Sequence, residues 1–161
     1  DMTHDSRLTQ ALRVLLHSRR VASLGTVGDD GTAFVSMVPF ALEPMQGAFI
    51  IHVSGLAVHT RNLLARPSVS LMVMESEVTG EPVHALARVT LEGMAKKLES
   101  GSEAWQASHD AYLARFPEAE PMTQLGDFVF FAITAAQARH VAGFGAARSI
   151  DEHEVRRAMS S

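Results

Sequence analysis

The strongest constraint on the fold is a series of short apolar runs separated by turns that are too short to contain a helix. Residues 21–27, 33–40 and 48–53 are rich in β-branched, aromatic and other apolar side chains, which favours strands. Residues 28–31 (Gly-Asp-Asp-Gly) have the composition of a hairpin turn, since Gly and Asp tolerate positive φ. Strands joined in this way pair antiparallel, because parallel pairing needs a crossover connection. The sequence therefore disfavours a doubly wound parallel sheet.

Helices are predicted before, between and after these strands. Leucines at helical spacing form one apolar stripe near the N-terminus, with Thr3 or Asp5 as the expected cap. The helices are predicted over residues 1–19, 57–65 and 102–116. Further strands are predicted over residues 69–74, 88–98, 128–133 and 139–141. Loops are predicted over residues 75–82 and 117–126, and residues 150–161 are expected to form a loose C-terminal tail containing a polar helix.

This order of elements predicts an α+β fold whose small antiparallel sheet is closed, or nearly closed, into a barrel. A length of 161 residues predicts one domain. The chain has no cysteine, which excludes disulfides, cysteine-bound metals and a cysteine nucleophile. A net charge of −4 argues against nucleic-acid or membrane-surface partners. Without an apolar run of ~18 residues or a signal-peptide pattern, we expect a soluble cytoplasmic protein.

Common catalytic and metal-binding motifs are absent from the sequence. Residues 143–145 (Gly-Phe-Gly) begin like a dinucleotide fingerprint, but the third glycine and the surrounding βαβ unit are missing. His52 and His59 lie seven residues apart, and no third ligand can be assigned to them. We therefore expect no metal site built from side chains alone, and the sequence identifies no catalytic residue.

Residues 51–73 are the most informative stretch for function. A strand ends there in a small-residue turn and leads directly into the N-terminus of a helix. Free backbone N–H groups and the positive end of the helix dipole then face outward, beside Ser54, His59, Thr60 and Arg61. This arrangement is typical of a phosphate site. The alternative is a capped surface helix with ordinary solvated side chains.

From about Arg19 to Leu98 the chain resembles the pyridoxamine 5′-phosphate oxidase-like, FMN-binding split-barrel family. The resemblance rests on the segments VASLGTV, GDDG, FVSMVPF, AFIIHVS, HTRNLLARPSVSLMV and ARVTLEGMAKKL. It implies an antiparallel split β-barrel, a homodimer with FMN at the interface, and flavin-dependent oxidation or reduction of an unidentified small-molecule substrate.

The resemblance also implies which residues contact the cofactor. By position these are Ser36, Met37, Val38, Pro39, His52, Val53, Ser54, Val58, His59, Thr60, Arg61 and Arg88. Several positions that are Arg or Lys in the oxidases are uncharged here, among them Ser36 and Val58, so oxidation of vitamin B6 itself is not expected. A protonated His59, together with Arg61 and Arg88, would restore part of the positive charge and would make affinity pH-sensitive.

The C-terminal part resembles a subgroup related to bacterial haem-utilisation proteins. The resemblance rests on residues 139–147 (RHVAGFGAA), which follow the strand predicted at 128–133. The resemblance implies haem as the alternative to FMN, with His140 or His153 as the iron ligand and with Gly143 and Gly145 permitting close approach of the macrocycle. The competing interpretation of His140 is a hydrogen-bonded strand residue, and of His153 a solvated helix residue. A third alternative is a dimeric binding module without enzymatic activity.

Overall fold

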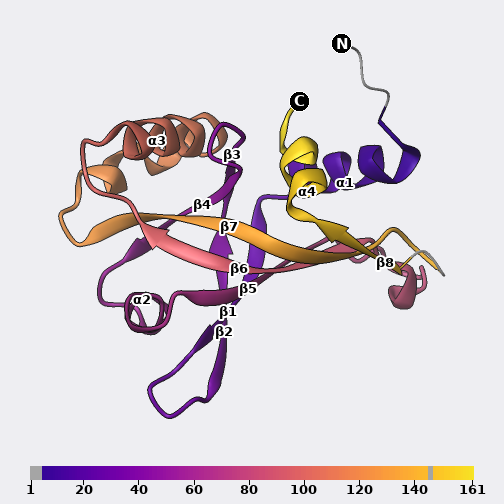
Figure 1. The fold of residues 1–161 in the computed structure, drawn as a ribbon, viewed down its shortest axis with the longest axis horizontal. Helices are drawn as coiled ribbons and strands as arrows, with labels where there is room; N and C mark the ends of the chain where they lie inside the picture. The colour runs from indigo at the N-terminus through magenta and orange to yellow at the C-terminus, as the bar shows by residue number, and fades with distance from the viewer. Residues whose placement is uncertain (1–4, 145–146) are drawn as a thin grey trace.

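The computed structural model describes residues 5–144 and 147–161. Within them, eight antiparallel strands form one sheet in the order β2-β1-β5-β6-β7-β4-β3, and β8 pairs with β7 (Figure 1). The strands are β1 (Val21–Val27), β2 (Ala33–Pro39), β3 (Ala41–Glu43), β4 (Ala48–Ser54), β5 (Ser68–Met74), β6 (Arg88–Lys97), β7 (Phe128–Val141) and β8 (Ala147–Asp151). The α+β fold with a half-barrel sheet and flanking helices agrees with the prediction.

Helices flank the curled sheet on different sides. They are α1 (Arg7–Ser18), α2 (Val58–Ala65), α3 (Glu103–Arg115) and α4 (Glu152–Met159), with 3₁₀ segments η1 (Val83–Ala85) and η2 (Pro117–Gln124). Figure 1 shows α1 and α4 together above the concave side, while α3 lies over β3, β4 and the start of β7. The main core lies on the concave side and joins α1 and α4 to strand residues such as Leu24, Leu71 and Leu91. A second apolar cluster lies beneath α3 and includes Ile50, Tyr112 and Phe130.

Strands and helices with clear local patterns form where they are predicted. The hairpin turn at 28–31 joins β1 to β2, and Gly31 there has a φ of 83°. Pro39 has no N–H to donate, and its strand β2 lies at the edge of the sheet, which is where a strand tolerates proline. Helix α1 begins later than predicted because Ser6 is its cap and accepts a hydrogen bond from the Thr9 N–H. Asp5 instead forms ion pairs with Arg13 and Arg157, and Thr3 lies outside the described residues.

Four other expectations about the fold are wrong. The short strands β3 and β8 were not predicted, and residues 117–124 form a 3₁₀ helix where a loop was expected. The strands predicted at 128–133 and 139–141 are one strand, because residues 134–138 pair with β6 despite their small and polar side chains. The C-terminal segment is not loose: Asp151 caps α4, and Val155, Ala158 and Met159 are buried in the core.

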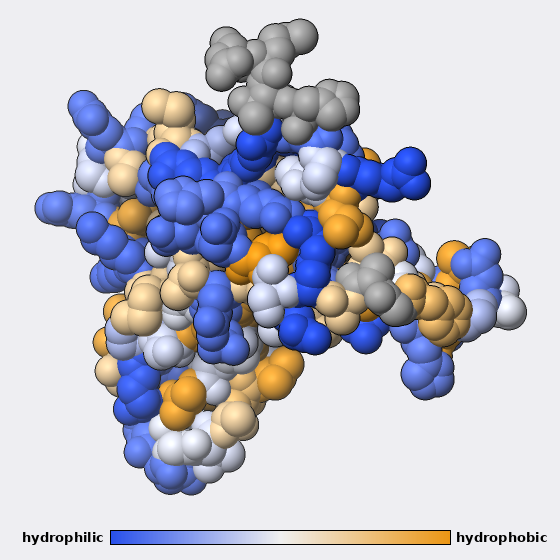
Figure 2. Space-filling model, turned by 45° about the vertical axis from the view of Figure 1, so that its right-hand side comes forward, coloured by the Kyte–Doolittle hydropathy of each residue, from blue (hydrophilic) through white to orange (hydrophobic). Residues whose placement is uncertain are grey.

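The convex face of β1, β2, β5 and β6 carries exposed apolar side chains. Val35 is 69% exposed, Met37 64% and Met94 50%. Figure 2 shows apolar residues interspersed with hydrophilic ones in the lower part of the molecule, where Figure 1 places the β1–β2 hairpin. We call this surface the open sheet face. Scattered exposed apolar residues are normal, but a row along neighbouring strands is typical of an interaction surface.

Candidate functional site

The start of α2 brings together part of the predicted phosphate site. The Ser36 hydroxyl on β2 lies 2.8 Å from Nδ1 of His59, which joins the edge strand to the helix. The residue at the cap position of α2 is Ala57, which cannot accept a hydrogen bond through its side chain. Within the described residues, the first N–H groups of the helix therefore have no side-chain partner. Thr60 is not available, because its hydroxyl donates a 2.6 Å hydrogen bond to the Ser54 carbonyl.

We call the group formed by Ser36, His59 and Arg61 at the start of α2 the cradle. Its electrostatics differ from the sequence-based expectation. Burial lowers the pKa of His59 below its ordinary value, so the imidazole is neutral at neutral pH. A protonated His59 therefore does not replace the missing positive charge. Arg61 is the exposed cation on the same helix turn. A phosphate dianion here would be held mainly by neutral donors, which form weaker bonds than charge-assisted pairs.

Other residues from the predicted cofactor set lie elsewhere. Val38 and Val53 are buried in the main core, Met37 points outward on the open sheet face, and Pro39 and Val58 offer no polar side chain. His52 lies beneath α3, where its ring packs 4.3 Å from Phe130 between ring centroids. Arg88 is on β6, which is separated from β2 by β1 and β5. The structure does not bring His52 and Arg88 into the cradle formed by Ser36, His59 and Arg61.

A larger hollow lies on the convex side of β6, β7 and β8, and we call it the β6–β8 groove. Its volume is about 860 Å³. Its lining residues are Arg88, Thr90, Glu92, Ala136, Gln137, Ala138, Arg139, Val141, Ser149, Ile150 and Asp151. Arg139 lies 3.4 Å from the Ser149 hydroxyl, and Gln137 donates to Glu92 at 3.2 Å. Arg88 and Arg139 thus give the groove two guanidinium groups beside small side chains.

Apart from Arg88, this groove was not predicted. Arg139 and Gln137 lie two residues apart on β7 and therefore share one face of the sheet. This could have been predicted only if residues 137–139 had been recognised as part of one strand. The small and polar side chains of residues 134–138 do not predict that the strand continues through them.

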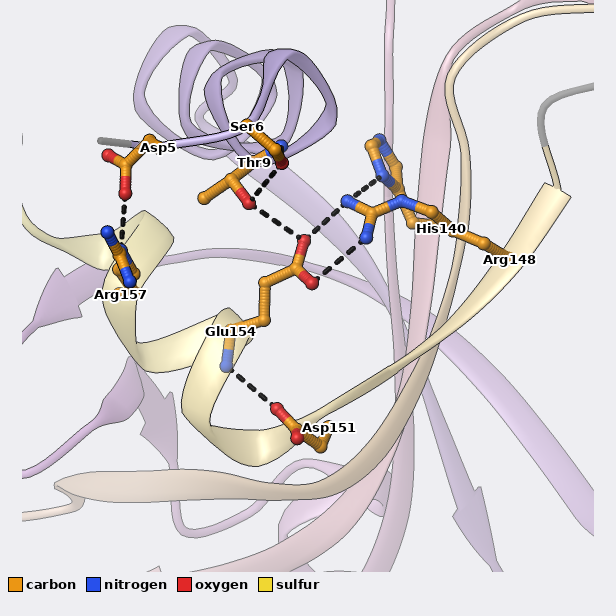
Figure 3. A network of polar contacts seen from close by, with 8 residues as sticks. All are labelled: Asp5, Ser6, Thr9, His140, Arg148, Asp151, Glu154 and Arg157. Atoms are coloured by element: carbon orange, nitrogen blue, oxygen red, sulfur yellow. Dashed lines mark hydrogen bonds and ion pairs between the residues drawn. The ribbon is translucent and has the colours of Figure 1, made fainter. Parts of the chain in front are cut away.

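His140 is fixed in a buried polar network that links β7 and β8 to α1 and α4 (Figure 3). The side chain is fully buried, and Arg148 donates to its Nδ1 at 3.1 Å. Arg148 also pairs with Glu154, which accepts a 3.2 Å hydrogen bond from Thr9. Burial first, and then the Arg148 charge, lowers the pKa of His140.

This network decides how His140 can act. Because Nδ1 accepts from a guanidinium, the proton of the neutral ring lies on Nε2. Nε2 is buried and has no hydrogen-bond partner within the described parts of the chain. Neither nitrogen therefore offers an accessible lone pair, and the hydrogen-bonded interpretation of this strand histidine is the one that fits.

His153 has the opposite environment. It lies in the first turn of α4 with its side chain 86% exposed, two residues beyond Asp151 of the β6–β8 groove. It borders a smaller hollow of about 260 Å³ together with Gln46, Gly47 and Arg156. Gly143 lies in the loop before β8, whereas Gly145 lies outside the described residues.

Residues 5–144 and 147–161 lack two features. No group of three or more His, Asp or Glu side chains lies close enough together there to hold a metal ion. None of the helices there has both the length and the apolar character needed to cross a membrane.

Comparison with known sequences gives a consistent result. A family model described as Pyridoxamine 5′-phosphate oxidase matches residues 8–142. Heme oxygenase HutZ of Vibrio cholerae is 32% identical over 145 residues, which cover 89% of this chain and 81% of HutZ. The chloroplastic non-canonical heme oxygenase HOZ of Arabidopsis thaliana is 34% identical over 142 residues, which cover 86% of this chain but 41% of HOZ.

Solved structures agree with these matches. A heme binding protein from Mycobacterium smegmatis has a TM-score of 0.85 and 26% identity, covering 96% of this chain and 62% of that one. The crystal structure of HutZ, described as a heme storage protein, has a TM-score of 0.74 and 30% identity, covering 81% and 91% of the two chains. The chain thus spans most of HutZ but less than two thirds of the Mycobacterium and Arabidopsis proteins.

Proposed function

Because this chain belongs to the pyridoxamine 5′-phosphate oxidase family and its relatives are named for haem, we propose that it binds haem. The observation that carries the proposal is the β6–β8 groove, with about 860 Å³ of space and two arginines. FMN, the first expectation from the sequence, receives less support. Its phosphate would meet a neutral His59, and Thr60 already uses its hydroxyl within the turn.

The groove suits the chemistry of haem, which is a flat apolar macrocycle with two carboxylates. Ala136, Ala138 and Val141 leave room for a planar ring to approach the sheet. Arg88 and Arg139 offer the fork-shaped donors that bind carboxylates in pairs, beside the acidic residues Glu92 and Asp151 that also line the groove. When bound, haem would supply an iron centre, while residues of this chain would hold its carboxylates and contribute a ligand to the iron.

His153 is the residue that we propose as the axial ligand. Its imidazole is exposed, although it borders the smaller hollow with Gln46 and Gly47 rather than the β6–β8 groove itself. Both nitrogens of His140, in contrast, are hydrogen-bonded or buried. Neutral imidazole is the usual ligand of haem iron in proteins.

Substitution of the two histidines tests this assignment. His153→Ala is expected to shift the Soret band of the haem complex and to weaken haem binding at least about tenfold, the equivalent of about 1.4 kcal/mol. His140→Phe, the control, is expected to leave the position of the band unchanged while it lowers stability. The readout is a haem titration followed in the visible range. An unchanged spectrum for His153→Ala would exclude His153 as the ligand.

We also propose that two copies of this chain pair through the open sheet face. Val35 and Met37 on β2 and Met94 on β6 are exposed on this one face of the sheet, and a second copy would remove them from water. The measurement is the mass of the purified chain in solution, expected to be twice that of the 17.4 kDa monomer. A monomer at micromolar concentration would contradict the pairing.

Haem oxidation is the second candidate function, and the names of the two sequence relatives favour it. In that case haem is the substrate. The check is the decay of the haem absorbance when a reductant and dioxygen are both present, compared with the same sample without dioxygen. Equal spectra would leave binding as the function.

A further inference from the structure

A second cavity lies beneath α3, and we call it the α3 cavity. Its volume is about 440 Å³. The strand residues that line it come from β4, the end of β6 and the start of β7, and residues 123–126 contribute another side. It shares no lining residue with the β6–β8 groove, and the cradle residues Ser36 and His59 do not border it. It is therefore a separate place on the molecule.

One side of the cavity is aromatic, formed by Trp105, Phe128 and His52 over the buried Phe130. His52 is surrounded by Phe128, Phe130 and Tyr112, at centroid distances of 5.2, 4.3 and 5.7 Å. Trp105 contacts Phe130 edge-on at 5.8 Å and also lines the cavity. Such a wall favours a planar aromatic ligand, because ring pairs at these separations contribute more binding free energy than their buried area alone would give.

His52 is the polar group within this aromatic wall. Only 7% of its surface is exposed, and Nδ1 is buried without a hydrogen-bond partner in the described part of the chain. A buried polar atom left unpaired costs free energy, so such an atom calls for an explanation. Burial, with a smaller effect from His109, lowers the pKa of His52 to about 4, so the ring is neutral and can both donate and accept.

We propose that the α3 cavity binds a small, uncharged aromatic molecule that carries a hydroxyl or ring N–H group. The ring of the guest packs against Phe128 and Trp105, and its polar group forms a hydrogen bond with His52 through Nε2, because Nδ1 is buried.

The charges around the cavity agree with an uncharged guest. Lys97 and Glu99 both border it, so neither sign of charge is favoured. Tyr112 stays protonated, because burial raises its pKa to about 12. A charged ligand would also lose its hydration free energy without gaining a partner of opposite charge.

Phenol is the simplest probe, and Trp105, the only tryptophan in the chain, reports on it. Saturable quenching or a wavelength shift of the Trp105 emission is expected on adding phenol. His52→Phe keeps the ring and removes the nitrogens, and should weaken phenol binding about tenfold, which is the value of one hydrogen bond. His84→Phe, on the exposed segment η1, is the matched control and should bind like the wild type.

Gly126→Leu provides a second variant that does not touch the aromatic wall. A side chain at Gly126 meets no atom within 4 Å at its Cβ, so folding is not threatened, yet the residue borders the cavity. We expect this variant to weaken phenol binding as well. A wild type without a saturable response, or equal affinities for the wild type and His52→Phe, would overturn the proposal. Because the two sites share no residue, His153→Ala should bind phenol normally whether or not haem binding fails.

Discussion

Replacing Gly93 with alanine is expected to lower the free energy of unfolding by about 3 kcal/mol or more, or to prevent folding. An added Cβ would lie 2.9 Å from the carbonyl carbon of Thr134 and nearer still to its oxygen. These are main-chain atoms of β7, which is the neighbouring strand. They cannot move aside without breaking the hydrogen bonds between β6 and β7.

Gly25 provides a matched control in the same sheet. A Cβ at Gly25 would lie 3.6 Å from the nearest atoms of Ser70, which is ordinary contact. Gly25→Ala should therefore change stability by less than about 1 kcal/mol. Urea denaturation of both variants checks the prediction, and equal midpoints for Gly93→Ala and the wild type would refute it.

The close approach at Gly93 also shapes the β6–β8 groove. The register between β6 and β7 shifts there, since Glu92 pairs with Gln137 while Gly93 pairs with Ala135. Ala136 is the extra residue of this bulge and lines the groove. Bulges re-aim the side chains next to them. We therefore expect haem binding to suffer in any Gly93 variant that still folds.

Lowering the pH from 7 to 4 is expected to cost about 3 kcal/mol of stability through His52 alone. The pKa of His52 is about 4 in the folded protein and near its ordinary value of 6.5 when the chain is unfolded. Between these values the unfolded state binds more protons. The contribution of His52 is therefore fully present above pH 6.5 and is lost as the pH falls toward 4.

His52→Phe isolates this contribution. The variant should be at least as stable as the wild type at pH 7, because an unpaired buried nitrogen is replaced by an apolar ring. Its loss of stability between pH 7 and pH 4 should be smaller by about 3 kcal/mol. His59 and His140 also have lowered pKa values, but they titrate in both proteins and cancel in the comparison. Chemical denaturation at several pH values measures the difference, and parallel curves would contradict a buried neutral His52.

Local patterns predict much of this fold. The alternation in β1 and the turn at 28–31 depend on neighbouring residues, so the hairpin can be recognised without the rest of the chain. The same holds for α3, whose cap Ser102 is the first residue of the helix predicted over 102–116. Strand β8 is different, because its residues are too polar to predict a strand on their own. It forms only because the chain turns back after β7 and β8 pairs with β7.

The candidate sites depend on longer-range packing. Alternation places His52 and Val53 on opposite faces of β4, but nothing local indicates that α3 covers the face with His52. Arg139 joins Arg88 only because β7 continues through residues 134–138 and pairs with β6. His140 is sealed by Arg148 and Glu154, which reach it from β8 and α4. The sequence predicts the cradle at α2, which is local, and misses the groove, which is not.

The most direct test of the central claim is the visible spectrum of the purified chain titrated with haem and, separately, with FMN. We expect a saturable Soret band with about one haem per chain, and no saturable change in the flavin bands. Weakening of haem binding when Arg88 and Arg139 are both replaced by Gln would assign the haem to the β6–β8 groove. Saturable FMN binding by a chain that shows no haem-dependent change would contradict the account.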